Sequence, residues 1–447
     1  MILQRERLRR ALLLYLAATT VFYVLFGLTT IAFWGWRELF ADQWRLYKFY
    51  LGLPFPANIV FLENGHRPVL PGIVRVAEIH IFHGNQRLQL FIGALLALAT
   101  FALIAWRIIH DKELSAIARS CGVTLTAVAI FWLANVRTLV HGNESVHAYL
   151  LTTYLCAAVI LTHSAISRSR NEFPVASPGV WTRLALASLC AIVSTFSFGS
   201  GIGAFVSVAA LLVIARMPAR YLLPVALGLT TALLIYFALP RGNAVLAQGT
   251  LFSPLLNIRY AAQWIASPAI YLVKPFVDVH SPMWPPVFPI KNVSAFCAQR
   301  VNEQFGWVMH WVWPQALIGI AGFGALLVAS LKVWRERRLL GNTETLGFGL
   351  AWFGMAVALL IGVTRGRFFQ NVPEDVYAYR YLVWPCLFWL GLGLIGIGWR
   401  ARITPGNASA EVSGARRVAR ITQGAVITIS ILALATEFGW WQYVRHV

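Results

Sequence analysis

The chain has 447 residues, of which 58% are hydrophobic and only 12% charged, and its formal net charge is +20. An ordinary soluble domain is about 25% charged, so this composition excludes a soluble globular protein and indicates a membrane protein. The positive charge is also typical of nucleic-acid binding, but Lys and Arg that flank membrane spans on the cytoplasmic side explain it better. We therefore expect membrane lipid, and no nucleic acid, among the partners.

The apolar residues fall into stretches close to the length that crosses a bilayer, about 20 residues in a helix. This pattern predicts an all-α polytopic membrane protein with about eleven transmembrane helices in one domain, 1–447. The stretches are 11–35, 88–106, 121–136, 146–167, 183–198, 202–216, 221–239, 312–331, 346–363, 381–398 and 423–440.

The basic residues give these spans a direction. If the N-terminus is cytoplasmic, the short inner loops are basic throughout, as the positive-inside rule requires. The opening MILQRERLRR and the apolar stretch after it have signal-like features but lack a small-residue cleavage site, so we expect a retained first span. An odd number of spans then places the C-terminus outside.

Two outer loops are long, 36–87 and 240–311. In the first, RELFADQWRLYKFYL interleaves aromatic and charged residues, which is typical of a helix lying in the membrane interface. In the second, NIRYAAQWIASPAIYLVKP is expected to form another interfacial helix or a re-entrant one. A polar cytoplasmic linker is expected at 399–422. No separate soluble domain and no internal repeat is visible.

Asp42 follows the first span directly, in FADQWRLYKFY. A carboxylate held at the boundary between water and lipid can accept a proton from a hydroxyl nucleophile. The alternative is a solvated carboxylate on an interfacial helix, without a chemical role.

Two other outer segments carry chemistry-bearing side chains. ENGHRP brings Glu63, His66 and Arg67 together, as a phosphate site or as a capped turn. TRGRFFQNVPEDVYAYRY holds Arg365, Arg367 and Arg380, which either anchor to lipid headgroups or line a pocket for a lipid-linked phosphate.

Small residues in STFSFGSGIGAF (194–205) favour close helix packing over a phosphate loop. HGNESVH (141–147) holds metal-ligand types, but a continuous helix would turn its last His away from its first, so no metal site is predicted there. The five cysteines have no metal-like spacing, and we expect no disulfide and no zinc site.

Together these features resemble the GT-C membrane glycosyltransferases, which share a many-span bundle and an acidic catalytic residue early in a first outer loop of interfacial helices. The resemblance rests on the first span, the loop 36–87 and Asp42. It is narrower with uncharacterised bacterial members, through His66–Arg67, the FSFG segment 196–199, and Arg380–Tyr381 with Trp389 further on. Asp42 departs from the family's frequent Asp-Glu pair, because Gln43 follows it. This departure argues against a metal-dependent mechanism.

The resemblance implies a transfer of sugar from a polyprenyl-phosphate donor to an acceptor hydroxyl, with inversion, on the periplasmic face of a bacterial inner membrane. Asp42 would be the base, and the donor phosphate would bind His66, Arg67, Arg365, Arg367 and Arg380. Contacts to sugar or acceptor would come from Glu63, Trp44, Tyr47 and Tyr381. The acceptor would be a glycan, a lipid or a secreted protein. No cofactor is assigned, and a divalent metal is not supported.

Three other readings remain open from the sequence. A polysaccharide polymerase or ligase also joins lipid-linked sugars outside the membrane, but usually carries its largest outer loop late in the chain. A transporter or flippase for lipid-linked sugar would show charged or broken helices at the bilayer midplane and often internal repeats. A purely structural subunit would carry its outer Arg and acid clusters without a shared cavity.

Overall fold

The computed structural model describes residues 2–39, 42–63, 65–171, 178–239, 250–277, 312–399 and 410–446, and these form an all-α structure. Its elements are α1 (Ile2–Trp34), α2 (Asp42–Gly52), α3 (Ala57–Val60), α4 (Val69–Phe82), α5 (Arg87–Ile109), α6 (Ala116–Phe131), η1 (Leu133–Asn135), α7 (Val136–Val140), α8 (Gly142–Asn171), α9 (Pro178–Thr195), η2 (Gly199–Ile202), α10 (Gly203–Ile214), η3 (Ala219–Leu222), α11 (Leu223–Ala238), α12 (Pro254–Ile265), α13 (Ser267–Val277), α16 (Val312–Glu336), α17 (Asn342–Thr364), α18 (Gly366–Asn371), η4 (Pro373–Tyr377), η5 (Tyr379–Tyr381), α19 (Val383–Trp399) and α20 (Ala410–His446).

The chain is a multi-pass membrane protein. Among the described residues, nine helices are long and apolar enough to cross a bilayer. Two of the eleven predicted spans, 202–216 and 381–398, coincide with shorter apolar helices, Gly199–Ile214 and Val383–Trp399. The predicted count of eleven is therefore confirmed for nine spans by length and composition.

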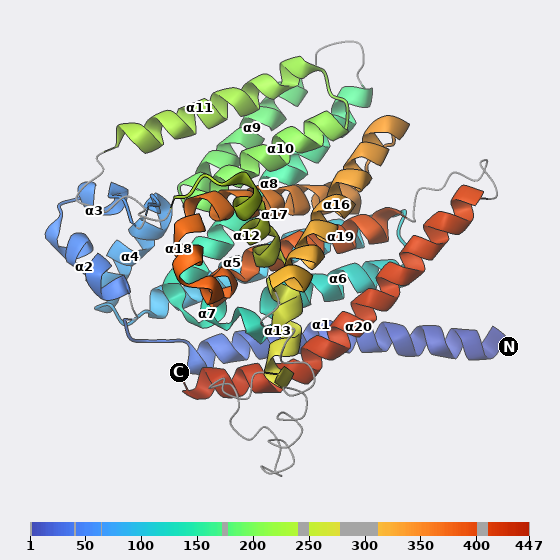
Figure 1. The fold of residues 1–447 in the computed structure, drawn as a ribbon, viewed down its shortest axis with the longest axis horizontal. Coiled ribbons are helices and arrows are strands. Elements are labelled where there is room, and N and C mark those ends of the chain that lie inside the picture. Colours follow the sequence, from blue (N-terminus) through green and yellow to red (C-terminus); the bar gives the residue numbers. More distant parts are fainter. Residues whose placement is uncertain are drawn as a thin grey trace, which may run out of the picture.

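The long helices run roughly side by side, with α17 and α19 packed in the interior (Figure 1). Glycines allow these two backbones to touch: a Cβ added to Gly347 would lie 2.7 Å from the carbonyl oxygen of Gly391. The N-terminus and the C-terminal end of α20 lie at opposite ends of the bundle, and α2, α3 and α4 lie at the C-terminal end (Figure 1). We call this end the α2–α4 end.

The two long loops contain helices, as the sequence predicted. In the first, α2 to α4 fold over the end of the bundle. Of the second loop, 240–311, the structure describes residues 250–277. There, α12 is buried from Tyr260 to Ile265 against α16 and α17. The expected linker 399–422 is helical from Ala410 onward, as the start of α20.

The third predicted span does not continue as one helix. Trp132 takes an extended conformation that ends α6, and the chain restarts as η1 and α7. The break leaves the backbone N–H of Leu133 without a helical partner. The carboxyl group of Glu437 on α20 accepts this N–H, with both oxygens 3.2 Å from the nitrogen, and Trp132 Nε1 donates to Thr436. The last helix therefore stabilises the break.

Replacing Glu437 tests this contact. Glu437→Ala leaves the Leu133 N–H buried without an acceptor, which costs about 1–3 kcal/mol. Glu437→Gln keeps an acceptor oxygen at the same place. We expect the thermal unfolding midpoint in detergent to fall clearly for the Ala variant and to stay near wild type for the Gln variant. Equal midpoints for Glu437→Ala and wild type would contradict this account.

Candidate functional site

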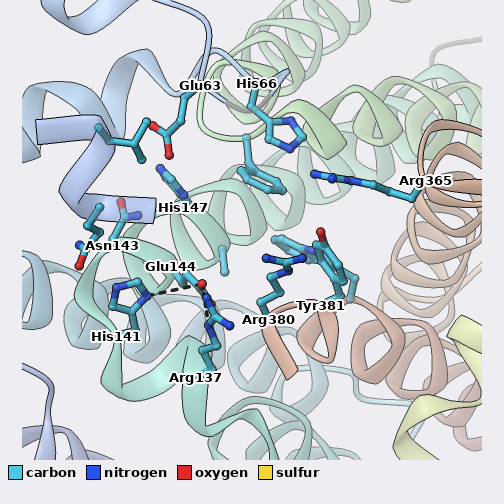
Figure 2. A pocket seen from close by; sticks show the side chains of 15 residues that line it. Glu63, His66, Arg137, His141, Asn143, Glu144, His147, Arg365, Arg380 and Tyr381 are labelled. Carbon is cyan, nitrogen blue, oxygen red and sulfur yellow. Dashed lines mark hydrogen bonds and ion pairs between the residues drawn. The ribbon is translucent and has the colours of Figure 1, made fainter. Parts of the chain in front are cut away.

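A polar cavity of about 100 Å³ lies at the α2–α4 end, where several helices begin or end (Figure 2). Segments far apart in the sequence contribute to it, from the first loop to the start of α19. It is lined by Gln43, Leu46, Glu63, His66, Arg137, His141, Asn143, Glu144, His147, Ala148, Phe198, Arg365, Arg380, Tyr381 and Trp384.

The break after α6 places one wall of this cavity. It turns the chain so that Arg137 on α7, His141 between α7 and α8, and Glu144 and His147 in the first turns of α8 all line the cavity. The sequence predicted one continuous helix through 141–147, which would turn His147 away from His141, so it did not indicate these residues as a group. The extended conformation of His141 is the reason, because it releases the chain from helical spacing.

Both carboxylates in the lining are paired with arginines. Arg137 Nε donates to Glu144 Oε1 at 2.8 Å, and His141 Nδ1 lies 3.5 Å from the same oxygen. Glu63 faces the buried guanidinium of Arg75, which donates to both of its oxygens. In each pair the positive charge of the arginine offsets the negative charge of the carboxylate.

Arg365 and Arg380 add two further guanidiniums to the lining. Arg365 sits at the junction of α17 and α18, and its side chain extends toward His66 and into the cavity (Figure 2). Across the described part of the chain, no acceptor contacts the Arg365 guanidinium. Arg380 lies over the ring of Tyr381, 5.0 Å from its centroid. The lining therefore carries more positive than negative charge and suits an anion.

Aromatic stacking holds the imidazole of His66. The centroid of its ring lies 4.1 Å from that of the Phe198 ring, and the centroid of the His147 ring lies 5.5 Å from that of Phe198. A Cβ on Gly199 would come within 2.4 Å of His66 Nδ1, so this position needs a glycine. The FSFG segment thus shapes the cavity through Phe198 and Gly199.

His66 is neutral at physiological pH. Burial removes water from its ring, and the guanidinium of Arg365 disfavours a second positive charge nearby. These two causes, burial first, lower the pKa of His66 to about 3. The ring therefore offers one N–H donor and one acceptor nitrogen to a ligand, without a charge.

Of the predicted site residues, the cavity brings together Glu63, His66, Arg365, Arg380 and Tyr381. Asp42 is the first residue of α2, and the next residue, Gln43, lines the cavity. The Asp42 side chain lies outside the described residues, so its role as a base stays a prediction.

Arg67, predicted to bind the donor phosphate, does not line the cavity. Its side chain is fully buried, and it donates to three backbone carbonyls: Val60 at 2.7 Å, Tyr236 at 2.7 Å and Leu239 at 2.6 Å. Arg67 therefore fastens the end of α11 to the α3–α4 connection. It is absent from the cavity lining because these carbonyls take up its donors.

Three other predicted residues also lie outside the lining. Arg367 is exposed on α18, and Trp44 is 67% exposed. The Tyr47 hydroxyl accepts a hydrogen bond from Gln86 Nε2 at 2.7 Å. None of these three side chains therefore contributes to the cavity lining.

Metal-ligand types do not gather into a metal site in the part of the chain that the structure describes. No group of three or more His, Cys, Asp or Glu with suitable placement occurs there. The donors in the cavity are mostly imidazoles and guanidiniums, and its two carboxylates are engaged with arginines. This donor set favours an anionic ligand.

The chain was compared with family models, curated proteins and solved structures. No family model and no curated protein matches the sequence. The chain is similar to the archaeal oligosaccharyltransferase AglB from Archaeoglobus fulgidus, solved in complex with an inhibitory peptide and a dolichol-phosphate. The TM-score is 0.43 and the sequence identity 14%, over 95% of this chain and 56% of AglB. This chain therefore spans little more than half the length of AglB.

Arg67 and Arg367 offer a matched test of the two kinds of arginine. Arg67→Ala removes three buried hydrogen bonds to carbonyls and should lower stability by about 3 kcal/mol or more. Arg367→Ala removes the same charge from an exposed position and should leave stability within about 0.5 kcal/mol. Thermal unfolding in detergent measures both. An Arg67→Ala protein as stable as wild type that no longer binds a phospholipid-type anion would instead make Arg67 a phosphate ligand.

Proposed function

We propose that the protein is a GT-C type membrane glycosyltransferase. It moves a sugar from a polyprenyl-phosphate donor to an acceptor hydroxyl at the periplasmic face of a bacterial inner membrane. The observation that carries this proposal is the convergence of Arg365, Arg380 and His66 in one cavity beside the start of α2, the helix that begins with Asp42.

The cavity suits the phosphate of such a donor. Guanidinium groups bind phosphate oxygens through paired N–H donors, and Arg365 has its donors uncommitted among the described residues. The two lining carboxylates are paired with their own arginines, so they add little repulsion toward an anion. A phosphate held by Arg365 and Arg380, with a hydrogen bond from His66, would be stabilised most when it leaves with full negative charge.

An apolar groove next to this cavity suits the isoprenoid chain of the donor. It has a volume of about 700 Å³ and lies between α10, α11 and α17. Its lining reaches Val363, two residues before Arg365, so a lipid chain in the groove would bring its phosphate to the arginine. It is lined by Ile202, Gly203, Phe205, Val206, Ala209, Leu222, Val225, Ala226, Leu229, Leu233, Ala356, Leu359, Leu360 and Val363.

The reaction follows from these placements. Asp42 takes the proton of the acceptor hydroxyl, and the hydroxyl oxygen forms a bond to the anomeric carbon. The bond from that carbon to the phosphate oxygen breaks, and its electron pair leaves with the polyprenyl phosphate. Arg365 and Arg380 stabilise the added charge on the phosphate. Attack opposite the leaving group inverts the anomeric carbon.

The orientation follows from the two ends of the bundle. The cavity lies at the α2–α4 end, opposite the N-terminus (Figure 1). The basic short loops are expected at the end that carries the N-terminus. The positive-inside rule then assigns the cavity to the periplasmic face. Nucleotide sugars are absent there, which makes a lipid-linked donor the sugar source.

Two measurements test the proposal on the full chain in lipid nanodiscs. Binding of undecaprenyl phosphate, read by native mass spectrometry, probes the phosphate site. Transfer of radiolabelled sugar from lipid-linked donors, made in membranes of the producing cell, probes the reaction. Asp42→Asn should bind the lipid as wild type does and transfer about 10²-fold more slowly or worse. Arg365→Ala should bind about tenfold more weakly.

Arg367→Ala is the matched control, because it removes the same charge two residues away from an exposed side chain. It should keep both binding and transfer. If wild type shows neither binding nor transfer, the glycosyltransferase proposal fails. If Asp42→Asn transfers sugar at the wild-type rate, the proposal loses its base.

A further inference from the structure

His147 lies in the cavity wall, and the guanidinium of Arg75 contacts its imidazole ring. Its side chain is 5% exposed and lines the cavity from the second turn of α8. On its protein side, His147 Nε2 lies 2.6 Å from Nη2 of Arg75, a hydrogen-bond distance. Arg75 comes from α4 and is 2% exposed.

Arg75 is held in place by other partners. It donates to Tyr50 Oη and to Glu63 Oε2, and Nη2 lies 3.3 Å from Glu63 Oε1. Burial disfavours its charged form, but Glu63 and Tyr50 outweigh this effect and raise the pKa of Arg75 above its ordinary value. Arg75 is therefore a fixed, permanently charged donor.

This contact determines the proton of the imidazole. An arginine guanidinium has five N–H donors and no acceptor. A hydrogen bond at 2.6 Å therefore requires His147 Nε2 to be the acceptor, without a proton. In a neutral imidazole the proton then sits on Nδ1. The doubly protonated ring is excluded as well, because it would place an N–H and a positive charge against Arg75.

In the described part of the chain, the Nδ1–H group of His147 has no hydrogen-bond partner. Among the described residues nothing accepts a hydrogen bond from His147 Nδ1, and the ring lines the cavity. His66, by contrast, has neither ring nitrogen fixed by a described hydrogen bond. The two histidines next to Phe198 thus differ: His66 can present either nitrogen, and His147 only a donor.

We infer that Arg75 fixes His147 as a neutral Nδ1–H donor, which binds a phosphate oxygen of the lipid-linked donor and cannot act as a base. The inference rests on the proposed function for the identity of the ligand, and on Arg75 for the tautomer. His147 is then a binding residue of the cavity, and Arg75 is its positioning residue.

Two substitutions of His147 separate these roles. His147→Gln places an amide oxygen near the former Nε2, where it still accepts from Arg75, but it offers no donor at the Nδ1 position. His147→Asn places an amide N–H near the former Nδ1 but no longer reaches Arg75. The Gln variant should keep the thermal unfolding midpoint and bind undecaprenyl phosphate about tenfold more weakly. The Asn variant should keep binding within about threefold and lose thermal stability.

If His147 had only a structural role, the variant that loses more thermal stability would also lose more binding. That result would overturn the inference. Unchanged binding by His147→Gln would overturn it too. Neither outcome touches the proposed function, because wild-type binding and transfer are measured separately.

The tautomer has a readout that needs no ligand. Long-range ¹H–¹⁵N correlation spectra of the ¹⁵N-histidine-labelled protein, with the His147 signals assigned by their loss in His147→Gln, report which nitrogen carries the proton. We expect an unprotonated Nε2 and a protonated Nδ1. An Nε2–H tautomer or an imidazolium at neutral pH would contradict the inference, even if the protein proves not to bind polyprenyl phosphate.

Discussion

One buried guanidinium joins the parts of the cavity. Arg75 on α4 contacts Tyr50 on α2, Glu63 after α3 and His147 on α8, so three segments of the first loop and one long helix meet at a single charge. A buried arginine is tolerated only when its charge and its donors are satisfied. The loop 36–87 therefore packs in one arrangement on the start of α8, and this packing places Glu63 and the nearby His66 in the cavity lining.

The same constraint acts at the other charged groups of this end. Glu144 is paired with Arg137, and Arg67 gives its donors to backbone carbonyls. With these groups satisfied inside the protein, the guanidiniums of Arg365 and Arg380 add further positive charge to the lining. An anion site inside an apolar bundle needs each lining carboxylate to be paired with a cation of the protein. A lining carboxylate without its own cation would repel the anion.

The sequence predicted the long apolar helices well, because stretches of bilayer length need no partner to be recognised. It also made Arg365 and Arg380 candidates, since basic residues at span ends expected to lie outside have no reason in the positive-inside rule. Both line the cavity. Arg67 shows the limit of this reasoning. It follows His66 directly and has the same chemistry as Arg365, but adjacent residues in a tight turn point to different sides. Arg67 stabilises the fold because backbone carbonyls at the ends of α3 and α11 lie within reach of its donors, and the sequence does not show where those carbonyls lie. The cavity-lining residues of α7 and α8 were not predicted as a group for a similar reason. Trp132 gives no local sign in the sequence that α6 ends there.

The central claim is that the cavity at the α2–α4 end holds the phosphate of a polyprenyl lipid. A cryo-electron microscopy structure of the full chain in nanodiscs with undecaprenyl phosphate tests it most directly. We expect phosphate density within hydrogen-bond distance of the Arg365 guanidinium, with the lipid chain following the groove between α11 and α17. Phosphate density elsewhere, such as at the opposite end beside Lys112 and Arg170, with no lipid in the cavity, would contradict it.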